Sequence, residues 1–260
     1  MQPAVRLREK LARKELITGI LITEHVWPDL VEISKRAGLD YVIVDLEHGP
    51  HAPDVVAEAC ATGRRLDFPV FIRPLANDYS TIRHCADLGP CGFLLASVET
   101  AAELDVVQDA LYLPPRGHRR PGGMSNRWVS DFTQPTWQAV VEENFVVLPQ
   151  VETRTGFKNA QAIANHELTT ALAVGPYDLS AELGVCGIMD APILREHLFA
   201  LRKIADEAGK MMWMIGGNAE KLTRDGWRFL CIGEPCNVLE VTLRDRVATA
   251  RRVMGEMDGK

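Results

Sequence analysis

The chain has 260 residues, of which 47% are hydrophobic and 25% charged, with a formal net charge of −6 and a pI near 5.7. The length allows one large α/β domain, and the acidic balance argues against a general nucleic-acid binder. No run approaches the roughly 20 apolar residues of a membrane span, and the first residues lead directly into charged helical sequence. We therefore expect a cytoplasmic protein without nucleic-acid or membrane partners.

The six cysteines give no sign of a metal or disulfide framework. None belongs to a Cys-x-x-Cys pair, and most lie in apolar or helical context. We expect reduced, structural thiols, because the alternative, a zinc site, lacks the spacing that it needs.

Short apolar runs alternate with segments of helical period along the chain. A helix over 3–14 precedes the first strand and is placed to cover the bottom of a barrel. Eight strands are expected, over 17–22, 41–46, 69–73, 92–96, 145–151, 171–175, 211–215 and 229–233. Strands that alternate with helices predict a parallel sheet. Eight such units favour a closed (β/α)8 barrel, the TIM-barrel form of the α/β class, in one domain over 1–260, rather than an open doubly wound sheet.

Three other segments have clear helical or loop character. A capping box at Thr100 and Glu103 opens a helix over 100–112, and Pro192 lies in the first turn of a helix over 191–208. The final segment, 237–256, is long and amphipathic. The stretch 113–136 is the one long irregular loop, expected near the amino-terminal face of the barrel or reaching toward a neighbouring subunit.

The most informative stretch runs from Tyr41 to Gly49. Four strand-forming residues are followed directly by Asp45, Glu47 and His48. Two more strands end in the same way, and an α/β protein carries its chemistry at the carboxyl ends of its strands. Polar residues also follow the other strands, among them Thr23, Glu24, Arg73, Ser97, Glu99, Gln150, Glu152, Asp178, Asn218 and Glu234. An enzyme is therefore the leading hypothesis.

Glu152 and Asp178 follow neighbouring strands. Two carboxylates that meet at one edge suit a hard divalent cation such as Mg²⁺ or Mn²⁺, whereas zinc would prefer thiolate or several imidazole ligands. The structural alternative is that Glu152 caps the next helix and Asp178 occupies an ordinary first turn.

His48 and Arg73 are the other candidate site residues. An imidazole titrates near neutral pH and can serve as a general base, although a lone histidine is often a hydrogen-bonded core residue. Arg73 closes an apolar strand, where its fork could hold a carboxylate or enolate oxygen. The alternative for Arg73 is an internal salt bridge to Asp45 or Glu47, and both roles can coexist.

These residues, in this order, resemble the HpcH/HpaI family of class II pyruvate aldolases over roughly 17–235. The motifs that carry the resemblance are Asp45-Leu46-Glu47-His48-Gly49, Arg73-Pro74, Asp87-Leu88-Gly89, Val98-Glu99-Thr100, Gln150-Val151-Glu152-Thr153 and Val174-Gly175-Pro176-Tyr177-Asp178-Leu179.

The resemblance implies a role for each matching residue. Glu152 and Asp178 match the ligands of a divalent cation, Mg²⁺, Mn²⁺ or Co²⁺. His48 matches the catalytic base, Asp87 its acidic partner, and Arg73 the group that holds the pyruvate oxygen. Gln150 and the segment Gly175-Pro176-Tyr177 match the pyruvate site, and Asp45 and Glu47 support it. Members typically assemble as hexamers with C-terminal helices between partner barrels, so a homo-oligomer (hexamer or trimer) is expected.

The implied reaction is the reversible, metal-dependent cleavage of a 4-hydroxy-2-oxoacid to pyruvate and an aldehyde through a pyruvate enolate. No lysine stands where a Schiff-base route would need one. The alternatives are oxaloacetate decarboxylation or another enolate-forming lyase reaction on the same site, and a barrel that binds a metal and a keto acid without turnover.

Four places depart from the family pattern. Ala96 replaces a proline, with Ser97 beside it, and Tyr177 replaces a small residue. The loop ends in Arg119-Arg120 where Arg-Gly is usual, and these side chains could bind a distal carboxylate or form a solvated basic loop. The last strand ends in Gly233-Glu234-Pro235-Cys236.

Overall fold

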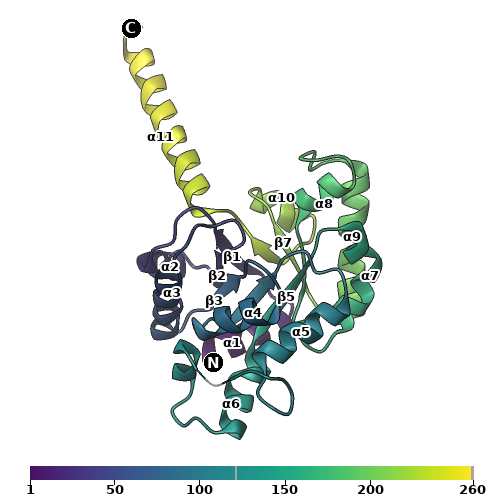
Figure 1. Ribbon diagram of the computed structural model, residues 1–260. Helices are drawn as coiled ribbons and strands as arrows, with labels where there is room; N and C mark the ends of the chain where they lie inside the picture. Colours follow the sequence, from purple (N-terminus) through teal and green to yellow (C-terminus); the bar gives the residue numbers. More distant parts are fainter. Residues whose placement is uncertain (121, 259–260) are drawn as a thin grey trace.

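Eight parallel strands close into a barrel in the computed structural model of the protein, which describes residues 1–120 and 122–258 (Figure 1). Strand order follows the chain from β1 to β8, and β8 pairs with β1. The strands are β1 (Ile17–Ile22), β2 (Tyr41–Asp45), β3 (Val70–Arg73), β4 (Gly92–Leu95), β5 (Val146–Val151), β6 (Leu172–Val174), β7 (Met212–Ile215) and β8 (Phe229–Cys231). The predicted α/β barrel is confirmed. Positions 121, 259 and 260 of the expected domain lie outside the described residues.

Helices surround the barrel and connect each strand to the next (Figure 1). The α-helices are α1 (Gln2–Ala12), α2 (Pro28–Arg36), α3 (Pro53–Leu66), α4 (Tyr79–Asp87), α5 (Ala101–Leu111), α6 (Gln134–Val140), α7 (Arg154–Asn165), α8 (Pro176–Glu182), α9 (Pro192–Glu207), α10 (Ala219–Arg224) and α11 (Pro235–Asp258), and the 3₁₀ turns are η1 (Met124–Trp128) and η2 (Glu142–Asn144). Among the described residues, no helix is long and apolar enough to cross a bilayer.

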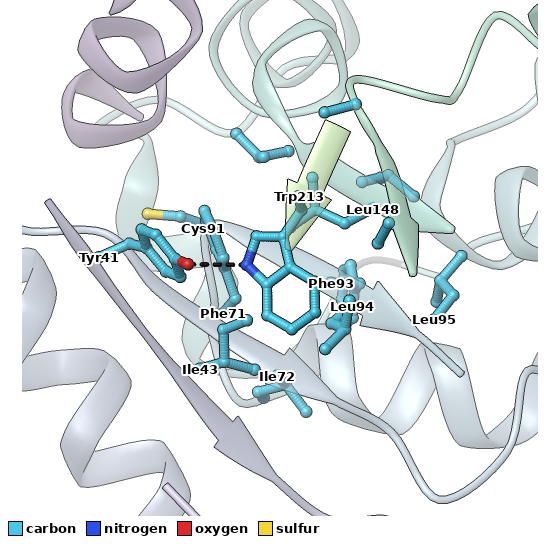
Figure 2. Packing of buried hydrophobic residues seen from close by; sticks show 14 of the residues in the cluster. Tyr41, Ile43, Phe71, Ile72, Cys91, Phe93, Leu94, Leu95, Leu148 and Trp213 are labelled. Atoms are coloured by element: carbon cyan, nitrogen blue, oxygen red, sulfur yellow. Dashed lines mark hydrogen bonds between the residues drawn. The ribbon is translucent and has the colours of Figure 1, made fainter. Parts of the chain in front are cut away.

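The barrel interior is filled by large side chains, as Figure 2 shows. The Tyr41 hydroxyl accepts a hydrogen bond from Nε1 of Trp213 at 2.7 Å and donates one to the carbonyl of Leu230 at 2.8 Å. The Tyr41 ring fits only because residue 19 is a glycine, since a Cβ at that position would lie 2.4 Å from the ring. The Phe71 ring stacks on Tyr41 at 5.5 Å between centroids. Both the indole N–H of Trp213 and the hydroxyl of Tyr41 therefore have a hydrogen-bond acceptor inside the apolar core. These bonds link β7, β2 and β8 without leaving a buried donor unpaired.

Helix α1 closes the amino-terminal end of the barrel, as predicted. Its Ala4, Leu7 and Leu11 are buried. Arg8 donates from Nη1 to the carbonyl of Phe145, just before β5, at 2.8 Å.

The stretch 113–136 lies at the same end, as expected, but it is not irregular throughout. It contains η1 and the start of α6. Thr133 caps α6 by accepting from the Thr136 amide at 3.4 Å, and Pro135 occupies its first turn. The prediction of an unbroken loop was therefore wrong, because threonine followed by an early proline is a local helix-start signal that it overlooked.

Helix α11 leaves the barrel after β8 and projects away from it (Figure 1). A set of its apolar side chains is exposed: Val238, Leu239, Val241, Leu243, Val247, Val253, Met254 and Met257. All six cysteines are free, four of them buried and only Cys186 fully exposed.

Candidate active site

The carboxyl-terminal rim, meaning the loops that follow the strands at their carboxyl ends, gathers most of the predicted site residues. The side chains on this rim are Thr23 after β1, Asp45, Glu47 and His48 at the end of β2, Arg73 at the end of β3, Ser97 after β4, Gln150 and Glu152 at the end of β5, and Asp178 after β6. Because all strands are parallel, residues distant in sequence come to one face of the barrel.

Arg73 and Asp45 form a buried ion pair across neighbouring strands. The strand register places the two residues side by side. Nε of Arg73 donates to Oδ1 of Asp45 at 2.7 Å and Nη2 donates to Oδ2 at 2.5 Å. Nη1 lies 3.2 Å from Oε2 of Glu47, and the Thr23 hydroxyl donates to Asp45 at 2.9 Å. The internal salt bridge that the sequence left open is therefore present.

The surroundings of this ion pair shift the pKa of both its members. Burial opposes ionisation of Asp45, but the hydrogen bonds and charge of Arg73, with a bond from Thr23, outweigh it and lower the pKa of the carboxyl. Burial likewise lowers the pKa of Arg73, and Asp45, Glu47 and Glu152 together reverse that effect and raise it. Arg73 is thus a permanent, fixed positive charge at the rim.

Glu152 is 5% exposed and is held by donors from two strands. Its Oε1 accepts from both the amide nitrogen and the hydroxyl of Ser97, each at 2.7 Å. Its Oε2 accepts from Nε2 of Gln150 at 2.5 Å. Glu152 does not cap the next helix, because Thr153 caps α7 through the Gly156 amide at 3.0 Å. The structural alternative for Glu152 is therefore wrong.

The carboxylate of Glu152 lies in an acidic environment. Burial is the largest cause that raises the pKa of this carboxyl, and the negative charges of Asp178 and Glu47 raise it further, against the hydrogen bonds from Ser97. Asp178 lies exposed in the first turn of α8. The carboxylates of three strand ends thus act on one another, which is the condition that a cation would relieve.

Gly175 lets β6 approach the Glu152 carboxylate closely. A Cβ at this position would lie 2.0 Å from Oε2 of Glu152 and 2.5 Å from Nε2 of Gln150. Pro176 then begins α8, and Tyr177 is 61% exposed at the rim. Glycine is required here because any side chain would displace the carboxylate.

His48 lies on the rim with its side chain 62% exposed, and its Nε2 is 3.8 Å from Oε2 of Glu47. It is therefore not a core histidine. The carboxylate that lies beside its ring is that of Glu47, to which the resemblance assigned only a supporting role.

Asp87 lies at the opposite end of the barrel from His48. It is the last residue of α4, which runs back from the rim toward the start of β4. Oδ1 of Asp87 accepts from Nη2 of Arg119 at 2.7 Å. Within one chain Asp87 and His48 therefore lie apart, because α4 carries Asp87 to the amino-terminal face, and the pairing of the two stays a prediction.

The Arg119-Arg120 pair shares that location. Arg119 is 1% exposed and also donates to Ser125 at 2.9 Å, so it is not part of a solvated loop. Arg120 is exposed and lines a cavity of about 740 Å³ with Tyr79 and His118. Neither arginine faces the rim of its own chain.

The donors around Glu152 suit a hard cation. Glu152 and Asp178 supply carboxylate oxygens, and Oε1 of Gln150 is buried without a hydrogen-bond partner among the described residues. Oxygen donors of this kind fit Mg²⁺ or Mn²⁺. Elsewhere on the rim, ligand atoms of Glu24, Glu234 and Cys236 lie within 4.8 Å of one another.

Sequence reasoning placed Thr23 and Ser97 at strand ends but assigned neither of them a role in the site. Thr23 directly follows β1 and donates its hydroxyl to the buried carboxylate of Asp45, and Ser97, two residues past β4, donates its hydroxyl to the buried carboxylate of Glu152. Their position at strand ends was a usable signal, but their acceptors lie on other strands and were not visible in the chain.

The sequence has relatives of known activity. A 4-hydroxy-2-oxovalerate aldolase from Novosphingobium aromaticivorans is 32% identical over 200 residues, covering 76% of this chain and 72% of the relative. A hydroxypyruvate/pyruvate aldolase from Chromohalobacter salexigens is 28% identical over 221 residues, covering 84% and 87%. A 2-keto-3-deoxy-L-rhamnonate aldolase from Shigella boydii is 26% identical over 245 residues, covering 93% and 91%.

Solved structures share the fold. The HpcH/HpaI aldolase from Desulfitobacterium hafniense DCB-2 superposes with a TM-score of 0.84 at 23% identity, covering 94% of this chain and 96% of the other. The sequence profile described as HpcH/HpaI aldolase/citrate lyase matches residues 23–229, which is most of the chain. The protein is therefore a member of the HpcH/HpaI aldolase/citrate lyase family.

Proposed function

We propose that this protein is a metal-dependent aldolase that reversibly cleaves a 4-hydroxy-2-oxoacid to pyruvate and an aldehyde. The observation that carries the proposal is the arrangement of charged side chains at the rim. A buried Glu152, whose pKa is raised by burial and by the charge of Asp178, lies on the same face as an arginine fixed by two carboxylates. We further propose that the whole chain, 1–260, acts as one catalytic domain.

Glu152 and Asp178 would hold a divalent cation, with Oε1 of Gln150 as a further oxygen near them. When bound, the cation supplies Lewis-acid polarisation of the 2-oxo group of the substrate. The CitE protein from Mycobacterium tuberculosis, which shares this fold with a TM-score of 0.54 at 19% identity, has been solved in complex with magnesium.

Arg73 places positive charge where the enolate oxygen develops. Its Nε and Nη2 are engaged by Asp45, so the guanidinium cannot swing away from the rim. A preorganised charge of this kind commonly supplies about 10²–10³ in rate. Asp45 and Glu47 therefore act as supports that hold Arg73 in place.

His48 would take the proton from the 4-hydroxyl at Nε2, with Glu47 as the carboxylate that stabilises the resulting imidazolium. The exposed His48 side chain on the rim would be accessible to a substrate. Gln150 would line the pyruvate end. The backbone after Gly175 would receive the pyruvate carboxylate, and Pro176 and Tyr177 would form its wall.

A metal-depletion assay tests this proposal. Pyruvate release is measured from a panel of 4-hydroxy-2-oxoacids and from oxaloacetate, with Mg²⁺, Mn²⁺ and Co²⁺ each returned to metal-stripped protein. We expect activity with added metal and a loss of at least about 10²-fold in Glu152→Gln.

The matched control is Glu207→Gln, which makes the same change at the end of α9, where Glu207 is exposed and away from the rim. It should retain full activity. Full, chelator-resistant activity in Glu152→Gln would refute the proposal, and turnover of oxaloacetate alone would favour a decarboxylase.

We also propose a homo-oligomer, hexamer or trimer, that buries the exposed apolar side chains of α11. A helix of 24 residues is about 36 Å long, and its apolar side chains are exposed among the described residues of one chain. Light scattering should report an oligomer that dissociates in Leu243→Glu and persists in Thr249→Glu. A monomeric wild-type protein would contradict the proposal.

A further inference from the structure

Ser97 has an unusual backbone conformation. Its φ is +52°, in the left-handed region that a residue with a side chain seldom adopts. Two other non-glycine residues share this conformation among the described residues, Lys14 and Asp67, at φ +53° and +57°. Both of those lie just past the ends of helices, at α1 and α3, where a left-handed residue is common. Ser97 instead follows a strand at the rim.

The conformation of Ser97 accompanies a double contact with one oxygen atom. Both the amide N–H and the hydroxyl of Ser97 donate to Oε1 of Glu152, each at 2.7 Å. A carboxylate oxygen has two lone pairs, so Oε1 is fully engaged. An uncommon backbone angle that persists beside a candidate ligand suggests a functional constraint.

The other oxygen of Glu152 is turned the opposite way. Oε2 accepts from Gln150 and lies against Gly175, where a Cβ would approach it to 2.0 Å. Gly175 precedes α8, the helix that carries Asp178. The two oxygens of the Glu152 carboxylate therefore face different strands, Oε1 toward the end of β4 and Oε2 toward the end of β6.

We propose that Ser97 is a positioning residue that holds Oε1 of Glu152 and leaves Oε2 as the oxygen offered to the divalent cation. This inference rests on the proposed function. Ser97 acts through Glu152, so removing its hydroxyl lets the carboxylate rotate and weakens the preformed cation site. A purely structural link between β4 and β5 would affect stability and leave metal affinity unchanged.

Titration calorimetry of Mn²⁺ into metal-stripped protein tests the inference without relying on turnover. The informative variant is Ser97→Gly, because glycine accepts the left-handed angle and keeps the amide donor. We expect its Mn²⁺ dissociation constant to rise by about 10-fold or more, as is typical when a group that orients a ligand is lost. Ser97→Ala should show the same loss and serves if the glycine variant does not fold.

The control is Lys14→Gly, which relieves the same backbone angle at an exposed helix end far from the rim. It should bind Mn²⁺ like the wild type. Wild-type affinity in folded Ser97→Gly or Ser97→Ala would overturn the role of Ser97 and leave the proposed function standing. A wild-type protein that binds no Mn²⁺ would overturn both.

Discussion

Two buried arginines, one at each end of the barrel, show how differently the same side chain can be used. Arg73 at the rim makes a two-pronged contact with Asp45 and a third contact with Glu47, and these charges raise its pKa. Arg119 at the amino-terminal face meets Asp87 through one nitrogen, and burial lowers its pKa.

The surroundings explain the contrast. Nε and Nη1 of Arg119 have no hydrogen-bond partner among the described residues, and its guanidinium lies 5.4 Å from the Trp137 ring centroid. Arg119 therefore packs mainly against an aromatic ring. Arg73 instead lies among carboxylates that hold it with its charge at the rim. We therefore expect loss of Arg73 to affect chemistry and stability together, and loss of Arg119 to affect mainly stability.

The largest effect is expected for Arg73→Met. It leaves the buried Asp45 without its counter-ion, which typically costs about 3–5 kcal/mol of unfolding free energy. It should also lower kcat/KM by about 10²–10³. Urea unfolding and the pyruvate-release assay measure the two effects. A variant with near wild-type values in both would show that the paired arginine is dispensable.

His48→Ala should separate chemistry from stability. Since the His48 side chain is 62% exposed, its loss should leave the melting temperature nearly unchanged, while kcat falls by about 10²-fold or more. His118→Ala is the matched control, because that side chain is 80% exposed at the opposite end of the barrel. Equal activity in the two variants would remove His48 from the mechanism.

Arg119→Met should produce the reverse pattern. The methionine retains contact with Trp137 but leaves Asp87 with the more distant Arg83, at 3.5 Å, as its remaining cation. We expect a loss of about 1–3 kcal/mol in unfolding free energy. The kcat per folded protein should change less than twofold, because Arg119 lies at the end of the barrel opposite the rim. A drop comparable to that of Arg73→Met would show instead that this face contributes to catalysis.

The smallest effect is a pH dependence of stability from Asp45. Its folded-state pKa is lowered, so its ionised form stabilises the fold above the unfolded pKa of about 3.9. That contribution is lost as the pH falls through the lower folded value. The difference in unfolding free energy between wild type and Asp45→Asn should therefore shrink between pH 5 and strongly acidic conditions, about pH 2. A constant difference across this range would contradict the assigned ionic role.

The bounds of every strand were predictable to within two residues, because a buried parallel strand is a short apolar run flanked by polar residues. The predicted strand 17–22 coincides with β1, and the predicted 229–233 extends two residues past β8. The placement of Asp87 was also open to prediction. A helix after a strand must run back to the opposite face, so its last residue cannot lie at the rim.

Sequence alone determined the barrel, the order of its strands and which polar residues end them, since these depend on local periodicity and on connections that follow the chain. Tertiary structure decided which partners those residues take. The pairing of Arg73 with Asp45, the two donors of Ser97 on Glu152 and the burial of Arg119 arise between segments 28, 55 and 32 positions apart. Such contacts depend on strand register, backbone angle and side-chain packing, which a pattern of residue types does not encode.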